Sequence, residues 1–164
     1  MEQKFFFFDI DNTLAVWPEG KIPDSAQYCI DELQRRGHLV SIATGRIQVD
    51  AMRFAEQARI TNVVADGGHS ITIDGKLVSM IGMNRDMCIQ YLEYLESKHI
   101  PWAVTDRNKL GRITPYKEIL EWHPDWDVFK TVVDPEFDFH SVEDFYKIYV
   151  FFKDGEEEER ISSI

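Results

Sequence analysis

The sequence has little cysteine, an excess of acidic over basic residues, and no long apolar run. Its 164 residues include two cysteines, Cys29 and Cys88. Two thiols are too few for a disulfide framework, and this favours a cytoplasmic location. No apolar run approaches the roughly 20 residues of a membrane span, and the phenylalanine-rich start is too short for a signal peptide. Lys and Arg number 18 against 29 Asp and Glu, giving a net charge of −11. These features argue against nucleic acid and membrane partners, although a local cation site can still hold a phosphate.

The most informative segment is an apolar run, Phe5–Phe8, that stops on Asp9 and Asp11. A short apolar run bounded by polar residues predicts a buried strand of a parallel sheet. Ligands of open α/β sheets bind beyond the carboxyl ends of such strands, so both acids are expected at the edge of a crevice. Two neighbouring carboxylates repel each other unless a cation compensates them, and Mg²⁺ prefers oxygen ligands. The alternative is a strand that simply ends in an Asx turn.

A second apolar run, Leu39–Ala43, is followed by Thr44, Gly45 and Arg46. Gly45 permits close approach of the backbone, and the Thr44 hydroxyl and nearby amides can bind phosphate oxygens. Arg46 can add a bidentate phosphate contact. Alone, this tripeptide is typical of an ordinary strand-to-helix turn. Its position one βαβ unit after Asp9 favours a phosphate site.

The segments that connect and follow these strands also have clear patterns. Helices are predicted from a cap at Asp24 and Ser25 to a stop at Gly37, and again over 47–60. A third strand over 62–65 leads through a Gly-Gly loop to a hairpin that turns at residues 74–75. His69, in this loop, is interpreted as a polar loop residue, because no second His or Cys lies at metal-binding spacing.

The order Asp9, Asp11, Thr13 after a buried strand resembles the first motif of the haloacid dehalogenase superfamily of phosphatases. The resemblance implies that Asp9 is the nucleophile that forms an aspartyl-phosphate, and that Asp11 is the general acid and base. It also implies that the Asp9 carboxylate and the Asp11 backbone carbonyl bind Mg²⁺. Thr44 matches the second motif, in which a threonine or serine holds the transferring phosphoryl group.

The Gly-Gly loop and the hairpin resemble the Cof-type branch of this superfamily, whose members carry a large inserted cap domain. The chain departs from that branch at two positions. Asp66 stands where the branch usually has asparagine, and Asn12 stands where it usually has glycine. Neither change removes a catalytic group.

These patterns predict an α/β chain of two parts. Residues 1–80 form the N-terminal part of a HAD-like, Rossmann-like parallel-sheet core with a β-hairpin. Residues 84–164 form an inserted α/β sandwich cap with a small antiparallel sheet, and the chain is expected to end inside it. Strands are predicted near 101–105, 131–133 and 147–152. The aromatic residues of this part are expected to fill its core rather than form a base-stacking surface; they are Trp102, Trp122, Trp126, Phe129, Phe137 and Phe139.

Relatives supply two further motifs, a lysine and an acidic metal-binding region, and this sequence shows no convincing copy of either. Residues 134–138 could be the final metal motif of a compact enzyme, with Lys130 or Lys117 as the lysine. A surface turn at Pro135 is preferred. The glutamates of 156–159 are expected to begin a solvated helix. The open side of the incomplete core exposes backbone groups and apolar surface, which predicts self-association, a rearranged packing or a missing fragment.

The expected function is a Mg²⁺-dependent phosphatase that acts on small phosphorylated metabolites, sugar phosphates first, through an aspartyl-phosphate. The alternative is a catalytically incomplete phosphatase-like fragment that binds phosphate or a protein partner without turnover. Phosphomutase or dehalogenase chemistry is a third option. Asp11 argues against the dehalogenases, which lack the second aspartate.

Overall fold

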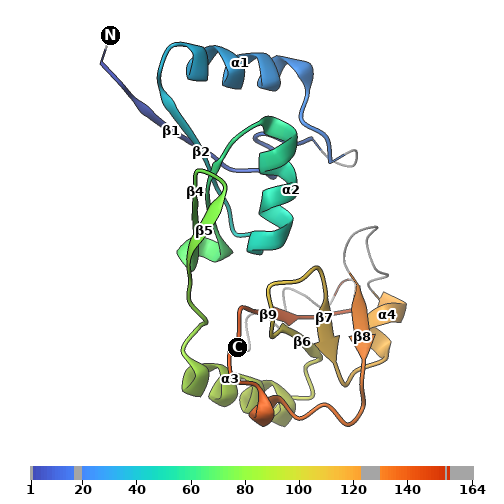
Figure 1. Cartoon of the computed structure of the whole chain (residues 1–164). Coiled ribbons are helices and arrows are strands. Elements are labelled where there is room, and N and C mark those ends of the chain that lie inside the picture. The colour runs from blue at the N-terminus through green and yellow to red at the C-terminus, as the bar shows by residue number, and fades with distance from the viewer. Residues whose placement is uncertain (1, 17–19, 123–129, 154, 156–164) are drawn as a thin grey trace. The chain divides into compact units, whose positions relative to one another are not determined.

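The computed structural model describes residues 2–16, 20–122, 130–153 and 155. The chain divides into two compact units, Met1–Ile81 and Gly82–Ile164, and Figure 1 shows the elements of each. Each unit has a sheet and a hydrophobic core of its own.

The first unit is built on a five-stranded sheet in the order β1-β2-β3-β4-β5. The parallel strands β1 (Phe5–Phe8), β2 (Leu39–Ala43) and β3 (Asn62–Ala65) lie side by side, with Phe8 opposite Ile42. The antiparallel hairpin β4 (Ser70–Ile73) and β5 (Lys76–Met80) extends the sheet beyond β3. The predicted parallel-sheet α/β core is therefore confirmed.

Two helices, α1 (Asp24–Arg35) and α2 (Gln48–Ala58), pack against one face of this sheet (Figure 1). Their apolar residues share one core with the side chains of β2 and β3; its members include Ile30, Val40, Ile42, Ala51, Phe54, Val63 and Ala65. The predicted cap of α1 at Asp24 or Ser25 is wrong: Pro23 is the N-cap and makes no side-chain bond. Pro23 has φ −65°, the value that its ring imposes, and an extended ψ of 151°, as N-cap residues typically have.

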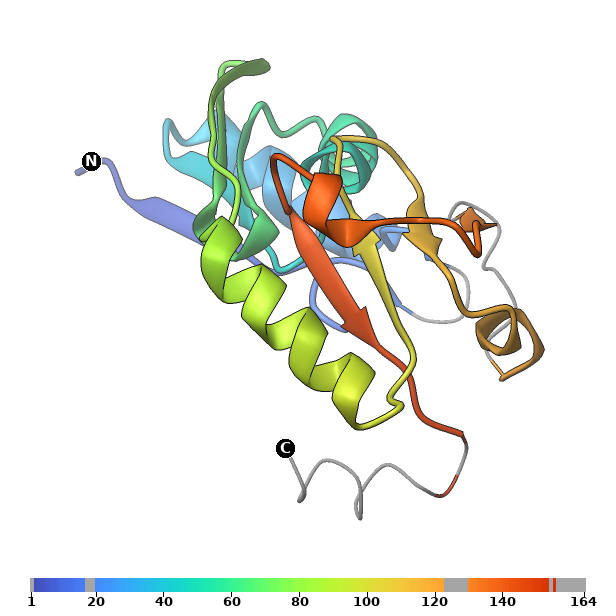
Figure 2. The same ribbon diagram turned by 90° about the horizontal axis from the view of Figure 1, so that it is seen from below.

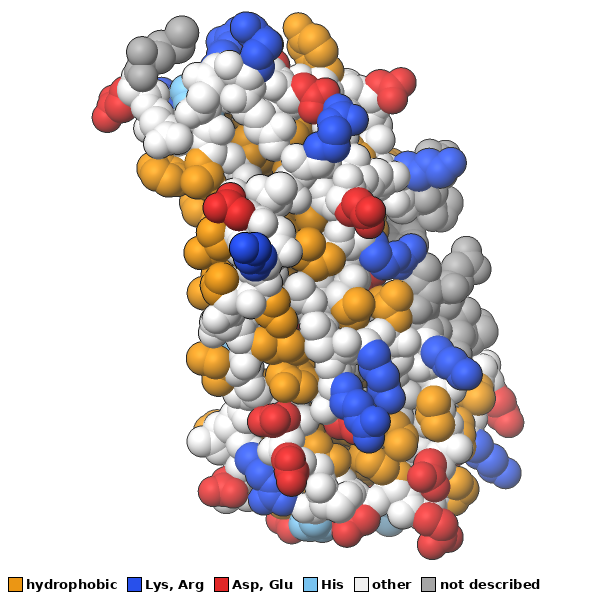
Figure 3. All heavy atoms as spheres, in the orientation of Figure 1, with side chains coloured by type: hydrophobic (Ala, Val, Ile, Leu, Met, Phe, Trp, Pro, Cys, Tyr) orange, Lys and Arg blue, Asp and Glu red, His pale blue; other side chains and the backbone are white. Residues whose placement is uncertain are grey.

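Strand β1 is only half buried, in contrast to the fully buried strand that its sequence predicts. Phe5 and Phe7 are 62% and 59% exposed, while Phe6 and Phe8 on the other face are half-buried. The reason is that β1 is an edge strand and that its Phe5–Phe7 face is not covered by α1 or α2. Figure 3 shows hydrophobic side chains on the side of the view where Figure 1 draws β1 and the hairpin.

The hairpin turn is confirmed at the predicted dipeptide. Asp74 has φ 49° and Gly75 has φ 76°, both in the left-handed region that a tight hairpin turn requires. The Asp74 amide donates to the Asn62 side chain, which ties the turn to β3.

The second unit has a four-stranded sheet in the order β8-β7-β6-β9. Strands β6 (Trp102–Thr105) and β9 (Lys147–Val150) are antiparallel neighbours, as are β6 and β7 (Arg112–Thr114). Helix α3 (Arg85–Ser97) packs on one face of this sheet, and Figure 2 shows it alongside. The side chain of Asn84 caps α3 by accepting from the Met87 amide.

One strand pair differs from the expected antiparallel sheet. Strand β8 (Thr131–Val133) runs parallel to β7, so the sheet is mixed. A parallel pair needs a long connection, and the chain between β7 and β8 is long enough to include α4 (Glu118–Trp122). Strand β7 was not predicted, because three residues after Gly111 give too short a pattern.

An aromatic core centred on Trp102 holds the second unit together. Trp102 is fully buried, with its ring edge-on to Tyr116 and Phe139 and its Nε1 donating to Glu96 at 2.8 Å. Phe137 is partly buried against the same core, and Trp122 is half-buried. The prediction that aromatics fill a core is confirmed for Trp102, Phe137 and Phe139. Trp126 and Phe129, like the 156–159 run, lie outside the described residues.

His140 is expected to make the stability of this unit depend on pH. Its ring nitrogens lie 3.2 Å from Glu93 Oε1 and 3.0 Å from Asp138 Oδ1, and these hydrogen bonds raise the pKa of His140 above 6.5. This stabilisation is fully present below pH 6.5 and is lost as the pH rises through the folded pKa. Urea unfolding at pH 6 and pH 8 should therefore show a drop in midpoint that His140→Gln removes. The control His99→Asn, at an exposed position that tolerates asparagine, should retain the drop; an equal loss in the control would contradict this role.

Two smaller expectations concern thiols and membranes. Cys29 is exposed and Cys88 is buried, and both are free. In the described part of the chain, no helix is both long and apolar enough to cross a membrane.

Candidate functional site

Asp9 and Asp11 lie on either side of a buried residue in the loop after β1. Ile10, between them, is fully buried, and its carbonyl accepts from the Ala15 amide at 2.8 Å. Asn12 follows with φ 58°, a left-handed conformation that glycine adopts freely and asparagine tolerates. This explains why asparagine can replace the usual glycine here. Asp9 is exposed, and Asp11 is half-exposed.

The loop after β2 is fixed by backbone bonds to β3 and to the loop after β3. The Thr44 amide donates to the Val64 carbonyl at 3.0 Å, and the Asp66 amide donates to the Arg46 carbonyl at 2.8 Å. Thr44 is 7% exposed, and its hydroxyl oxygen accepts from the Arg46 amide at 3.2 Å, which leaves the hydroxyl proton to donate. Gly45, between them, is exposed.

A network of ion pairs joins the two loops through Arg46. Its Nε and Nη2 donate to the two Asp11 carboxylate oxygens at 2.9 and 2.6 Å. Its Nη1 donates to Asp50 Oδ2 at 2.6 Å, and its guanidinium lies over the Phe54 ring at 4.8 Å. The hydrogen bonds to Asp11 and, to a smaller extent, to Asp50 raise the pKa of Arg46 above its usual value, although burial acts in the opposite direction. The two loops are therefore held together by a permanently charged group.

The structure brings Asp11, Thr44 and Arg46 into one site at the carboxyl ends of β1 and β2. Asp9 follows Phe8, whose partner in the register is Ile42, so Asp9 lies beside the end of β2. Arg46 was predicted to contact phosphate, and here its fork is bonded to Asp11. A phosphate would have to compete with Asp11 for this fork.

Asp50 is a site residue that the sequence analysis missed. Its side chain is only 4% exposed, in the first turn of α2, and it also accepts from Arg53 at 3.2 Å. The available signal was the spacing of Arg46 and Asp50, four residues apart, which places paired charges on one side of a helix start. A buried carboxylate held by two arginines fixes the orientation of the Arg46 fork.

Asp66 is expected to stabilise α2 as a cap supplied from another loop. Its carboxylate accepts from the Gln48 amide at 3.0 Å, and Ile47, the N-cap residue, makes no side-chain bond of its own. Asp66→Ala should therefore lower the free energy of unfolding by about 1 kcal/mol, the usual cost of a lost cap, plus a small strain because Asp66 has φ 52°. Asp66→Asn keeps an accepting oxygen and tolerates that φ, so urea unfolding should show little change. Equal losses in the two variants would exclude the cap as the cause.

The oxygen ligands at this site suit a hard cation, although they are few. The Asp9 carboxylate and the Asp11 backbone carbonyl are oxygen donors of the kind that Mg²⁺ prefers. The Asp11 carboxylate is bonded to Arg46. Across the ranges that the structure describes, no group of three or more His, Cys, Asp or Glu could hold a metal. His69 is exposed, with Nδ1 3.2 Å from the Ile81 carbonyl, which confirms its interpretation as a loop residue.

The alternative metal motif at 134–138 is a turn in the second unit. The Phe137 amide donates to the Asp134 carbonyl, and the Asp134 side chain accepts from the Glu136 amide. Pro135 lies within this turn, as the preferred interpretation predicts. This segment is therefore described as a surface turn.

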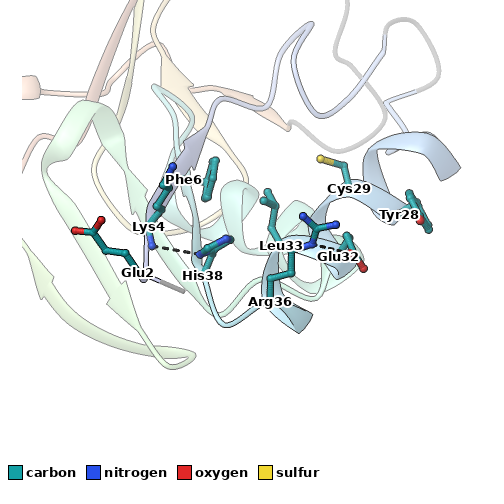
Figure 4. Close-up of a pocket in the computed structure, with 9 residues that line it drawn as sticks. All are labelled: Glu2, Lys4, Phe6, Tyr28, Cys29, Glu32, Leu33, Arg36 and His38. Atoms are coloured by element: carbon teal, nitrogen blue, oxygen red, sulfur yellow. Dashed lines mark hydrogen bonds and ion pairs between the residues drawn. The ribbon is translucent and has the colours of Figure 1, made fainter.

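A separate groove of about 550 Å³ lies beside the amino end of β1, away from Asp9 (Figure 4). Phe6 from β1 and Leu33 from α1 form its apolar wall, and Lys4, Arg36 and His38 add charged or polar groups. The Lys4 amide donates to the His38 ring at 3.3 Å.

Comparison with known proteins identifies relatives over almost the whole chain. YkrA of Bacillus subtilis (strain 168), provisionally named a phosphatase, is 25% identical over 161 residues, which cover 96% of this chain and 60% of YkrA. A solved structure of a hypothetical protein from Geobacillus kaustophilus has a TM-score of 0.73 at 24% identity and covers 99% of this chain and 62% of its own. The structure titled as the HAD subclass IIB sugar phosphatase BT4131 has a TM-score of 0.68 at 20% identity, covering 99% of this chain and 64% of its own.

The similarity to these solved structures shows the fold. The chain spans about 60% of the length of YkrA. A haloacid dehalogenase-like hydrolase from B. subtilis has a TM-score of 0.73 at 21% identity and shares this fold as well. The model of the family described as "haloacid dehalogenase-like hydrolase" matches residues 6–164 of this chain. The chain therefore belongs to the haloacid dehalogenase-like hydrolase family.

Proposed function

We propose that this chain carries the nucleophile half of a phosphomonoesterase site. Asp9 attacks phosphorus and forms an aspartyl-phosphate, and Asp11 first protonates the leaving oxygen and then removes a proton from the attacking water. The observation that carries the proposal is the convergence of Asp11, Thr44 and Arg46 beside the end of β1, where Asp9 lies. Family membership supports hydrolase chemistry at this position.

Each residue of the site has a distinct role in the proposal. The Thr44 hydroxyl and the exposed backbone at Gly45 bind phosphoryl oxygens, because a hydroxyl proton and amide groups complement their negative charge. Arg46 holds Asp11 in place through a two-point contact, and a bound phosphate would compete with Asp11 for this fork. The Asp9 carboxylate and the Asp11 backbone carbonyl would hold Mg²⁺, which would supply positive charge to offset that of the phosphoryl group.

The proposed substrates are small phosphorylated metabolites, with sugar phosphates first. This preference rests on the naming of BT4131 as a sugar phosphatase and on the provisional naming of YkrA as a phosphatase. A cytoplasmic location remains a prediction, and the two free thiols are consistent with it.

A second candidate is a phosphate-binding domain without turnover. It is favoured by one observation: the described residues contain no complete metal cluster. Hydrolysis of p-nitrophenyl phosphate by the 164-residue chain, with and without Mg²⁺, separates the two candidates. Turnover that requires Mg²⁺ supports the phosphatase. No turnover, together with calorimetric binding of inorganic phosphate that Thr44→Val weakens, supports the binding domain.

A further inference from the structure

Asp66 lies against the loop of residues 44–46, the proposed phosphate site, and three hydrogen bonds tie it and its neighbour to that part of the chain. The Asp66 amide donates to the Arg46 carbonyl at 2.8 Å, and the Gly67 amide donates to the Thr44 carbonyl at 3.2 Å. The Asp66 carboxylate accepts from the Gln48 amide at 3.0 Å. The two carbonyls flank the glycine of the loop, so Asp66 helps to fix the backbone whose amides are the proposed phosphate ligands.

The Asp66 carboxylate is buried, and it is close enough to the loop to act on a bound anion. Asp66 is 8% exposed. The Gln48 amide, from which it accepts, is three residues beyond that of Gly45, so these two amides are at most about 11 Å apart. Water screens a buried charge less than a surface charge, so the field of the carboxylate extends over such a distance. A phosphate bound at Gly45 would therefore be repelled by Asp66.

The same carboxylate occupies the amino end of α2. Helix amino ends attract anions, because their first amides have no partner within the helix and the helix dipole is positive there. Ile47, the N-cap residue, makes no side-chain bond, and the Asp66 side chain caps the helix in its place. A phosphate on the preceding loop depends on the same positive potential. Asp66 is thus an internal anion that offsets part of the potential offered to a phosphate.

The other buried carboxylate in the first turn of α2 is balanced by cations. Asp50 accepts from Arg46 at 2.6 Å and from Arg53 at 3.2 Å, so neutralising it would also change the ion pairs of Arg46. Asp66 can be neutralised more cleanly, because asparagine keeps an accepting oxygen for the Gln48 amide and tolerates the φ of 52°. Asp66 is therefore the position at which charge and hydrogen bonding can be separated.

We propose that Asp66 is a positioning residue whose negative charge weakens the binding of phosphate to the loop of residues 44–46. Its hydrogen bonds fix the loop, and its charge lowers the affinity of the loop for an anion. In a phosphatase, the consequence is weaker inhibition by inorganic phosphate and faster release of this product. That consequence rests on the proposed function, whereas the effect on phosphate binding requires no turnover.

Asp66→Asn is the direct test, because it removes the charge and keeps the shape of the side chain. Titration calorimetry measures the binding of inorganic phosphate to the purified 164-residue chain at one fixed Mg²⁺ concentration. We expect the variant to bind phosphate about three- to tenfold more tightly than the wild type, as expected for a partly screened charge at this range. Urea unfolding of the two proteins should agree, which verifies that the variant is folded and that the cap is retained.

Asp74→Asn is the matched control. Asp74 also has a left-handed φ, 49°, but it is exposed, and its amide donates to Asn62 at the amino end of β3. Asp66 follows the carboxyl end of the same strand. The control should bind phosphate as the wild type does. Equal phosphate affinity of Asp66→Asn and the wild type would overturn the proposal. An equal gain in both variants would also overturn it, because net charge rather than position would then be the cause.

Asp66→Ala tests the positioning role. It removes the charge together with the bond to the Gln48 amide, so the loop is less well fixed. We therefore expect it to bind phosphate more weakly than Asp66→Asn does. Binding as tight as that of Asp66→Asn would overturn the positioning role of this side chain.

Turnover of p-nitrophenyl phosphate, measured separately, distinguishes this inference from the proposed function. Turnover with unchanged phosphate affinity in Asp66→Asn would reject the inference and retain the phosphatase. Tighter phosphate binding by Asp66→Asn, in a chain without turnover, would retain the inference and reject the phosphatase. Failure of all the proteins to bind phosphate would overturn the inference, whatever the turnover.

Discussion

Asp9→Asn is expected to lower Mg²⁺-dependent hydrolysis of p-nitrophenyl phosphate by at least about a thousandfold. Asparagine keeps the size of Asp9 but offers a weakly nucleophilic amide, so the covalent step is lost. The exposed position of Asp9 after β1 means that the change should leave the fold intact. Steady-state rates of purified wild-type and variant chains, at saturating Mg²⁺, measure the effect.

Asp74→Asn is the matched control for this prediction. Asp74 is also exposed, lies in the hairpin turn of the same unit, and has a φ that asparagine tolerates. Its rate should equal that of the wild type. A folded Asp9→Asn variant that retains most of the wild-type rate would show that another group is the nucleophile, or that a contaminant hydrolyses the substrate.

Arg46→Ala is expected to lower the free energy of unfolding by about 3 kcal/mol, the lower end of the cost of breaking a buried ion pair. Asp50 is 4% exposed and would retain Arg53, which lies 3.2 Å away and is itself 46% exposed. Asp11 would lose its two-point partner as well. Urea unfolding measures the change. It should be accompanied by weaker phosphate binding, since Asp11 and the phosphate site lose the same fork.

Two further variants separate the ion pair from simple packing. Arg53→Ala removes the longer, more exposed contact to Asp50 and should cost less than about 1 kcal/mol. Asp50→Leu combined with Arg46→Ala removes both charges and should recover part of the loss. If Arg46→Ala costs no more than Arg53→Ala, the network does not stabilise the site as described.

The sequence patterns predicted those parts of the fold that depend on local chemistry. Short apolar runs before Asp9 and Thr44 located two parallel strands, and Asp74 with Gly75 located the hairpin. Gly37 ended α1 as expected, with φ 78° and its amide bonded to the Gln34 carbonyl. In each case neighbouring residues determine the conformation, so the pattern was sufficient.

Features that depend on distant residues were missed. The cap of α2 comes from Asp66, eighteen positions beyond Gln48, and no helix-start pattern includes it. Strand β7 has three residues, and its parallel pairing with β8 depends on the path of the chain through α4. The exposure of Phe5 and Phe7 depends on what lies beyond the edge of β1, which an apolar run does not indicate.

The candidate site was predicted as a set of residues, and the structure adds their connections. Asp11, Thr44 and Arg46 were selected individually, from strand ends and from family resemblance. Their contacts and the contribution of Asp50 require the two loops to meet in space. The spacing of Arg46 and Asp50 at the start of α2 was a weak signal of this network in the sequence.

The most direct test of the account is to trap the phosphoryl group on Asp9. The chain is mixed with Mg²⁺ and p-nitrophenyl phosphate, quenched in acid and reduced with borohydride, which converts an aspartyl-phosphate to homoserine. Peptide mass spectrometry then locates the reduced residue. We expect reduction at Asp9 that depends on Mg²⁺ and on substrate. Reduction at another carboxylate, or an unmodified Asp9 in a chain that turns over substrate, would contradict it.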